Sequence, residues 1–159
     1  TLSLHDALPI SINTDTGSSV INGLICLKKH GVCLEKYHPY ELPFNSRPSF
    51  YAFYDAYINK KKIVFSKVDN NVESFKATIA DGRPIITGIY VNDDFQDDCV
   101  LSEYPFPTNG HCCVIYGYYN TTFLARNSWG LDWGLNGNFQ IPFSYMSNIT
   151  DSWTLMIEN

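Results

Sequence analysis

Residues 109–139, NGHCCVIYGYYNTTFLARNSWGLDWGLNGNF, contain the pattern that decides how this chain folds. Two runs within this stretch, HCCVIYGY and TFLARNS, are rich in β-branched and aromatic residues and predict two strands joined by a turn. His111 opens the first strand and Asn127 ends the second, so a hairpin brings them side by side. An asparagine carbonyl can accept a hydrogen bond from one imidazole nitrogen and leave the other free to pair with a nucleophile. On its own this pair is weak evidence for one half of a catalytic site, because histidines at strand ends are more often structural.

The segments around the hairpin predict three helices. TGSSVINGLICLKKHG has apolar residues at helical spacing, with Ser18 or Ser19 as its cap and Gly31 at its end. PSFYAFYDAYINKK predicts a second helix, and NNVESFKATIADG predicts a third that is capped by Asn70 and ends at Gly82. The second helix carries an aromatic stripe that we expect to pack into the core, namely Phe50, Phe53, Tyr54, Tyr57 and Ile58.

Further strands are predicted at KIVFSKV, PIITGIYV, GNFQIP and SWTLMIE. Helices first and then a run of antiparallel strands indicate the α+β class. We expect a mainly helical part over about residues 12–60 and a β-rich part over about residues 61–159. Residues 1–11, TLSLHDALPIS, resemble the translated sequencing-adapter runs that contaminate metagenomic assemblies, and we expect them to be non-native.

Composition narrows the class of protein. The chain has 159 residues, enough for one domain, and its 45% hydrophobic and 17% charged residues indicate a globular protein. Its net charge of -5 and the lack of a basic stripe argue against a nucleic-acid partner. No apolar run has the roughly 18–20 residues that a membrane-spanning helix needs. Localisation and oligomeric state stay open.

Metal and modification sites have weak signals. The five cysteines form no zinc-type spacing with the histidines, so we expect no metal and no cofactor. Asp93, Asp94, Asp97 and Asp98 suggest calcium, but they lack EF-hand spacing and favour a solvated loop. NTT at residue 120 and NIT at residue 148 fit the glycosylation pattern, which also arises often by chance.

The fixed pattern around Asn127 is more specific than the His–Asn pair itself. RNSWGLDWGLNGNFQIP resembles the asparagine motif of papain family cysteine peptidases, and GHCCVIYGY resembles that family's histidine strand. TGSSVINGLICLKKHGVCLEKYHPYE and IADGRPIITGIYV are similar to the family's other segments, in the version of its bacterial and large-virus branch. The resemblance implies a papain-like fold, with part of its helical half and its antiparallel β-barrel-like half. It also implies a polypeptide substrate.

The resemblance implies roles for particular residues. It implies that His111 is the general base and the imidazolium of an ion pair, with Asn127 as its orienting partner. Trp129 would shield the His–Asn hydrogen bond from water, and Trp133 would lie on the leaving-group side. By the same alignment, Gly88, Gly110 and Cys112 lie near the pocket that selects the residue before the scissile one. The two glycines are expected to leave that pocket open.

The nucleophile is the departure from the family pattern. The family's cysteine lies about 130–150 residues before its histidine and asparagine, a distance that places it before residue 1. Cys112 points away from His111 on a strand, and Cys113 stands about 6.5–7 Å along the same face. Cys26 lies inside the first predicted helix and Cys33 lies just after it. Cys99 lies in the acidic loop. We therefore expect no nucleophile in this chain and a single peptidase domain, residues 12–159, that is truncated at its N-terminus and inactive alone.

Two other hypotheses compete with a peptidase fragment. The first is a papain-like homologue that has lost its nucleophile and serves as a binding module. The second is an unrelated antiparallel β protein that binds small ligands, which requires the tryptophan and glycine pattern to be coincidental.

Overall fold

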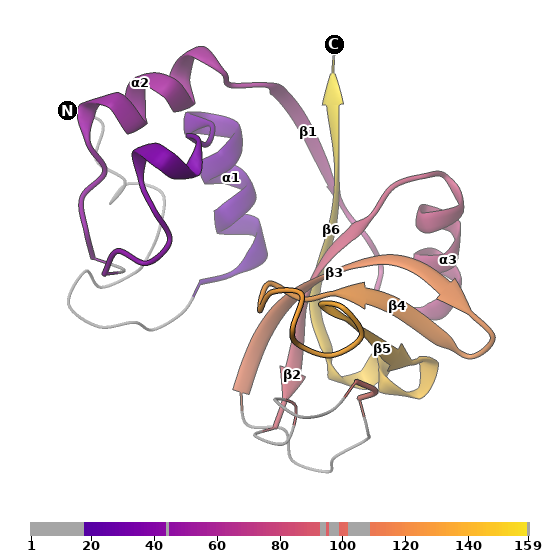
Figure 1. Cartoon of the computed structure of the whole chain (residues 1–159). Coiled ribbons are helices and arrows are strands. Elements are labelled where there is room, and N and C mark those ends of the chain that lie inside the picture. The colour runs from indigo at the N-terminus through magenta and orange to yellow at the C-terminus, as the bar shows by residue number, and fades with distance from the viewer. Residues whose placement is uncertain (1–17, 44, 93–94, 96–98, 102–108, 159) are drawn as a thin grey trace. The chain divides into compact units, whose positions relative to one another are not determined.

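The computed structural model describes residues 18–43, 45–92, 95, 99–101 and 109–158 (Figure 1). Residues 1–11 and the four aspartates of the acidic loop lie outside the described residues. The chain divides into two compact units. The first takes its residues from the part up to Val64 and from the last few positions, and the second is Phe65–Met156.

The first unit contains helices α1 (Val20–His30) and α2 (Phe50–Ile58), with a short 3-10 helix, η2 (Glu35–Tyr37), between them. Ser19, one of the two serines that the sequence allowed as the cap, caps α1 by accepting a hydrogen bond from the backbone N–H of Asn22. Gly31 ends α1 with a φ of 78°. A side chain at Gly31 would collide with the carbonyl oxygen of Ala56, so the glycine allows α1 to end against the backbone of α2.

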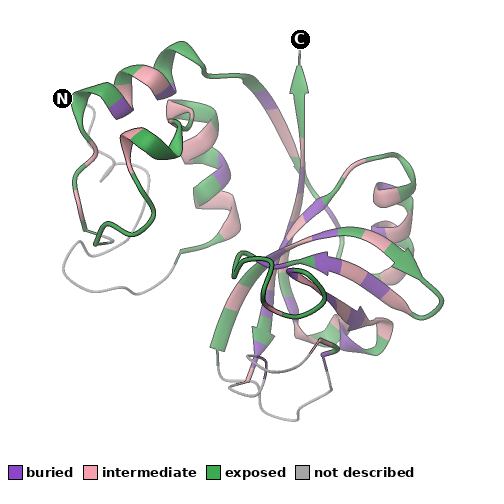
Figure 2. Cartoon of the chain, in the orientation of Figure 1, coloured by how far each residue is buried: buried purple, intermediate pink, exposed green. Residues whose placement is uncertain are grey.

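The aromatic stripe of α2 does not form a core, which corrects the expectation for this helix. Its buried residues are Ala52 and Ala56, which lie one turn apart on the same face. Most of the large side chains are exposed, and Figure 2 shows exposed residues along most of α2. The predicted stripe is Phe50, Phe53, Tyr54, Tyr57 and Ile58, of which only Phe53 is half-buried. The close approach of Gly31 to Ala56 fits only a face of small residues.

The strands form a six-stranded sheet in the order β1-β6-β2-β3-β4-β5. Their bounds are β1 Lys62–Lys67, β2 Ile85–Val91, β3 Asn109–Tyr119, β4 Thr122–Arg126, β5 Asn138–Pro142 and β6 Ile149–Glu158. β2 pairs antiparallel with β3 and β6, and β4 pairs antiparallel with β3 and β5. The α+β class predicted from the sequence is therefore confirmed.

Helix α3 (Val72–Ala80) and the 3-10 helix η4 (Phe143–Asn148) complete the second unit. Asn71 caps α3 by accepting from the backbone N–H of Ser74, so the predicted cap, Asn70, was wrong by one residue. Asn70 instead donates through its amide to the carbonyls of Ile149 and Thr150. The largest fully buried hydrophobic side chains of the second unit are Phe75, Ile85, Ile89, Phe95, Ile115, Phe123, Phe139, Ile141 and Tyr145.

Candidate active site

The β3–β4 hairpin brings His111 and Asn127 together. Val114 of β3 is paired with Arg126 of β4, so the residue after Arg126 falls beside the part of β3 that carries His111. The Nε2 atom of His111 lies 2.9 Å from the Oδ1 atom of Asn127. Asn127 is buried and His111 is half-buried. The proximity predicted from the hairpin is therefore observed.

The backbone of Ser128 fixes which way the Asn127 amide faces. Its N–H donates to Oδ1 of Asn127 at 2.8 Å, and a backbone N–H can only donate, so the atom that it meets must be the oxygen. The same oxygen meets Nε2 of His111, which must then carry the proton. This tautomer leaves Nδ1 of His111 unprotonated and able to act as a base.

The nitrogen of the Asn127 amide, unlike its oxygen, is not held by a hydrogen bond among the described residues. This Nδ2 atom is buried. An unsatisfied buried donor costs on the order of 1–3 kcal/mol. The orientation of Asn127 therefore depends on the oxygen, through Ser128 and His111.

Burial sets the electrostatics of His111. Desolvation lowers the pKa of the imidazole below its usual value, and the hydrogen bond to Asn127 partly opposes this by raising the pKa. Burial therefore favours the neutral imidazole, the form in which Nδ1 can accept a proton.

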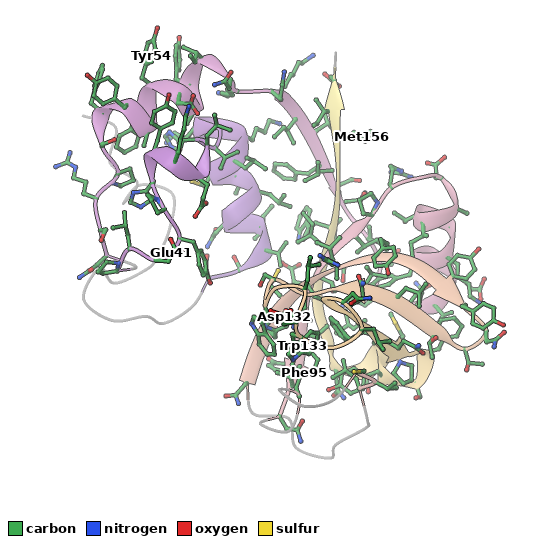
Figure 3. All side chains as sticks on the ribbon, viewed as in Figure 1. Glu41, Tyr54, Phe95, Asp132, Trp133 and Met156 are labelled. Carbon is green, nitrogen blue, oxygen red and sulfur yellow. The ribbon has the colours of Figure 1, made fainter. Side chains whose placement is uncertain are left out.

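Aromatic rings line one side of His111. The ring of Trp129 lies 4.9 Å from the imidazole, measured between centroids, and that of Phe95 lies 5.3 Å away. Trp133 contacts Trp129 edge-on at 5.1 Å and also packs on Phe139 of β5. Figure 3 labels Phe95 and Trp133 at this site. Sequence reasoning missed Phe95, although it is a single aromatic residue within a run of acidic residues, NDDFQDDCV.

Glycines shape the loop that carries the two tryptophans. Gly134 and Gly137 have φ values of 57° and 77°, which L side chains rarely adopt. A side chain at Gly137 would also lie 2.7 Å from the carbonyl oxygen of Gly130. Arg126 stabilises the same loop, because its Nη1 atom donates to the carbonyl of Asn136 at 2.7 Å. The pattern of glycines in the sequence thus has a conformational cause.

The expected pocket residues lie on paired strands. Gly88 of β2 is directly opposite Cys112 of β3, and Gly110 is opposite Tyr90. A side chain at Gly110 would meet nothing within 4 Å. At Gly88 the space is occupied, because Oγ1 of Thr150 lies 2.5 Å from where its Cβ would stand. The β2–β6 register shifts after Gly88, and this irregularity brings Thr150 over the glycine.

The cysteines do not supply an evident nucleophile. Cys113 is buried on the core side of β3, while Cys112 is exposed on the other side, as strand alternation predicts. Desolvation raises the pKa of both thiols, strongly for the buried Cys113 and also for Cys112, whose residue is partly accessible, and this opposes thiolate formation. Burial also raises the pKa of Cys26, which lies within α1, and all five cysteines are free thiols.

The described part of the chain holds neither a side-chain cluster suited to a metal ion nor a helix suited to a membrane. None of its histidine, cysteine, aspartate and glutamate side chains gather in threes close enough to hold a metal ion. Within the same residues, no helix is long and apolar enough to cross a membrane.

Known proteins share both the sequence pattern and the fold. The family model described as papain family cysteine protease matches residues 13–155. An uncharacterized peptidase C1-like protein of Acanthamoeba polyphaga mimivirus is 31% identical over 166 residues, which cover 91% of this chain and 53% of the viral protein. The chain thus spans about half the length of this curated relative.

Solved structures agree with these matches. Xylellain, a cysteine protease from Xylella fastidiosa, has a TM-score of 0.82 and 28% identity, covering 95% of this chain and 66% of xylellain. The Carica candamarcensis cysteine protease CMS1MS2 has a TM-score of 0.69 and 22% identity over 90% of this chain and 70% of its own, a likeness in fold alone. The predicted papain-like fold is therefore confirmed, and the hypothesis of an unrelated β protein is wrong. The chain belongs to the papain family of cysteine proteases.

Proposed function

We propose that this chain supplies the general base and its orienting amide to cysteine-type hydrolysis of peptide bonds. The observation that carries the proposal is the 2.9 Å bond between Nε2 of His111 and Oδ1 of Asn127, with the amide held by Ser128. That bond leaves Nδ1 of a neutral imidazole as the proton acceptor. Membership of the cysteine protease family supports the same chemistry.

In the proposed reaction, Nδ1 of His111 takes the proton of a cysteine thiol, and the sulfur forms a bond to the peptide carbonyl carbon. The imidazolium then gives this proton to the leaving nitrogen as the C–N bond breaks, which leaves a thioester. Water attacks the thioester while His111 takes its proton, and the acid product leaves as the thiol is restored. Asn127 stabilises the imidazolium by accepting from Nε2 in each step.

We further propose that the thiol comes from a segment outside this chain, so that residues 12–159 are part of a longer peptidase domain. Cys113 is buried among core side chains and Cys112 lies on the opposite face of β3 from His111. Gly110 and Cys112, beside the histidine, would border the site for a substrate side chain, together with Gly88, which is paired with Cys112 on the neighbouring strand. Trp129 would shield the His–Asn hydrogen bond, and Trp133 would flank the leaving group.

Alkylation by iodoacetamide at pH 6 tests where the thiol lies. We expect every cysteine of the folded chain to react no faster than it does in the urea-unfolded chain, because no thiol is activated. Mass spectrometry of peptides gives the rate for each cysteine. A cysteine that reacts faster when folded, and that loses this advantage in His111→Ala, would place the nucleophile within this chain.

Peptide hydrolysis tests the proposed function itself. A protein translated from a coding sequence extended upstream, with a cysteine in that extension, should cleave a fluorogenic peptide in a thiol-dependent way. His111→Ala should reduce kcat by about 10²–10⁴-fold, the usual contribution of a general base, while His38→Ala should not. Absence of turnover in the extended protein would favour the non-catalytic binding module.

A further inference from the structure

Phe95 connects the candidate base to the core of the sheet. Its side chain is only 2% exposed, although acidic residues surround it in the sequence. Its ring centroid lies 5.3 Å from those of His111, Trp129 and Trp133. It lies 5.1 Å from the ring of Phe139, which is a buried residue of β5. Phe95 therefore links His111 and the tryptophan loop to β5.

The ring angles show that Phe95 is itself firmly held. It meets Trp133 and Phe139 edge-on, at interplanar angles of 65° and 70°, and it is tilted by 52° against Trp129. Edge-on and tilted contacts are the favoured arrangements for aromatic pairs. A buried ring with such contacts on several sides has little room to move.

The imidazole of His111 completes a triangle of mutually touching rings. His111 lies 4.9 Å from Trp129 and 5.3 Å from Phe95, and those two rings lie 5.3 Å from each other. Rotation of the imidazole about its Cβ–Cγ bond would drive it into one of these rings. The two neighbours therefore restrict the ring to the orientation that directs Nε2 at Asn127. Trp129 is partly exposed, whereas Phe95 is not, so the rigid side of the triangle is Phe95.

We infer that Phe95 is a positioning residue for His111: its ring fixes the plane of the imidazole and excludes water from that side. The catalytic consequence of this inference rests on the proposed function, but the packing does not. The chain thereby uses a residue from the loop after β2 to set the geometry of a base on β3.

Replacement of Phe95 by Leu tests the inference through the pKa of His111. Burial is the main cause that lowers this pKa, so admitting water beside the imidazole should move it upward, toward 6.5. Among the described residues, Cys112 and Cys113 are the titratable groups that follow His111 on β3, and Asp132 is an exposed residue of the tryptophan loop. The variant leaves all of them in place.

The measurement is an NMR titration of the chain labelled with ¹³C-histidine, with the His111 signal assigned by its loss in His111→Gln. Phe123→Leu is the matched control, because Phe123 is also fully buried and contacts Phe75 and Phe143 instead. We expect an upward shift in Phe95→Leu and no shift in Phe123→Leu. Equal values in all three proteins, or equal shifts in both variants, would overturn the inference. None of these results requires peptidase activity, so they are independent of the proposed function.

Two further measurements test the inference if Phe95→Leu does not fold. Phe95→Met retains a similar volume without the ring, so it should loosen the imidazole and raise the pKa of His111 as well. In the unchanged chain, nuclear Overhauser effects should join the ring protons of Phe95 and His111. Their absence from a well-resolved spectrum of the unchanged chain would overturn the inference without any substitution.

Discussion

Helix α2 and the loop after β4 both carry aromatic residues, but they use them in opposite ways. In α2 most of the large rings are exposed and the small side chains of Ala52 and Ala56 are buried. In the loop, Trp129 and Trp133 contact each other and Trp129 contacts the imidazole of His111. Aromatic side chains thus face solvent on α2, whereas in the loop after β4 they pack around His111.

The difference shows what determines the burial of an aromatic residue. Around α2 the decisive feature is Gly31, which admits the backbone at Ala56 and so selects the small-residue face. In the loop the decisive features are glycines with positive φ and the bond from Arg126 to Asn136, which fold the chain back on itself. Neither outcome depends on the spacing of the rings, so spacing alone could not distinguish them.

The largest effect is expected for a buried ring of the sheet. Phe123→Ala should lower the free energy of unfolding by about 3–5 kcal/mol, because it leaves a cavity at a fully buried position. Urea unfolding followed by circular dichroism gives this value. A loss smaller than about 1 kcal/mol would mean that this ring is not in a close-packed core.

A glycine inside α1 and the glycine that ends it give the next effect and test the account of α2. Gly31→Ala should cost about 1–3 kcal/mol or more, since it places a side chain at positive φ and against Ala56. Gly23→Ala is the matched control within the helix, where an added Cβ meets nothing within 4 Å. It should stabilise by about 0.5–1 kcal/mol. If both substitutions stabilise the protein to the same extent, α1 does not end against α2 as described.

The pH dependence of the free energy of unfolding tests whether His111 is buried by its aromatic neighbours, unlike the exposed face of α2. The pKa of His111 is lower in the folded chain than its ordinary value of 6.5, so the unfolded chain binds this proton more readily. Above about pH 6.5 the imidazole is neutral in both states, and His111 does not reduce the free energy of unfolding. As the pH drops from 6.5 to the pKa of the folded chain, protonation of the unfolded chain lowers this free energy. Thermal unfolding over this range should show the loss in the unchanged chain and a smaller loss in His111→Gln. An identical dependence in both would contradict the burial of the imidazole.

The smallest effect is expected on α2. Tyr54→Ala removes an aromatic ring, as Phe123→Ala does, but this ring is exposed. The free energy of unfolding should therefore change by no more than about 0.5 kcal/mol. The same urea experiment measures it. A loss comparable to that of Phe123→Ala would show that the aromatic face of α2 is buried in solution.

Much of the fold was predictable because its signals are local. The cap at Ser19, the alternation along β3 and the hairpin that joins His111 to Asn127 all follow from neighbouring residues. The cap of α3 was displaced by one position, because Asn70 and Asn71 carry the same side chain and only the tertiary bond of Asn70 to β6 separates them.

The residues that sequence reasoning missed depend on contacts between distant segments. Phe95 is buried by rings on three other elements, although its own neighbours in sequence are acidic. Thr150 covers Gly88 because the register between β2 and β6 shifts there. The residue pattern of neither strand predicts that shift. Local periodicity cannot report such pairings, since they are set by tertiary packing.

The tautomer of His111 tests the central claim most directly. A long-range ¹H–¹⁵N NMR spectrum of the folded chain, recorded above the pKa of His111, distinguishes a protonated from an unprotonated imidazole nitrogen. The geometry predicts a proton on Nε2, donated to Oδ1 of Asn127, and a bare Nδ1. A proton on Nδ1, with Nε2 bare, would contradict the assignment of His111 as a base oriented by Asn127.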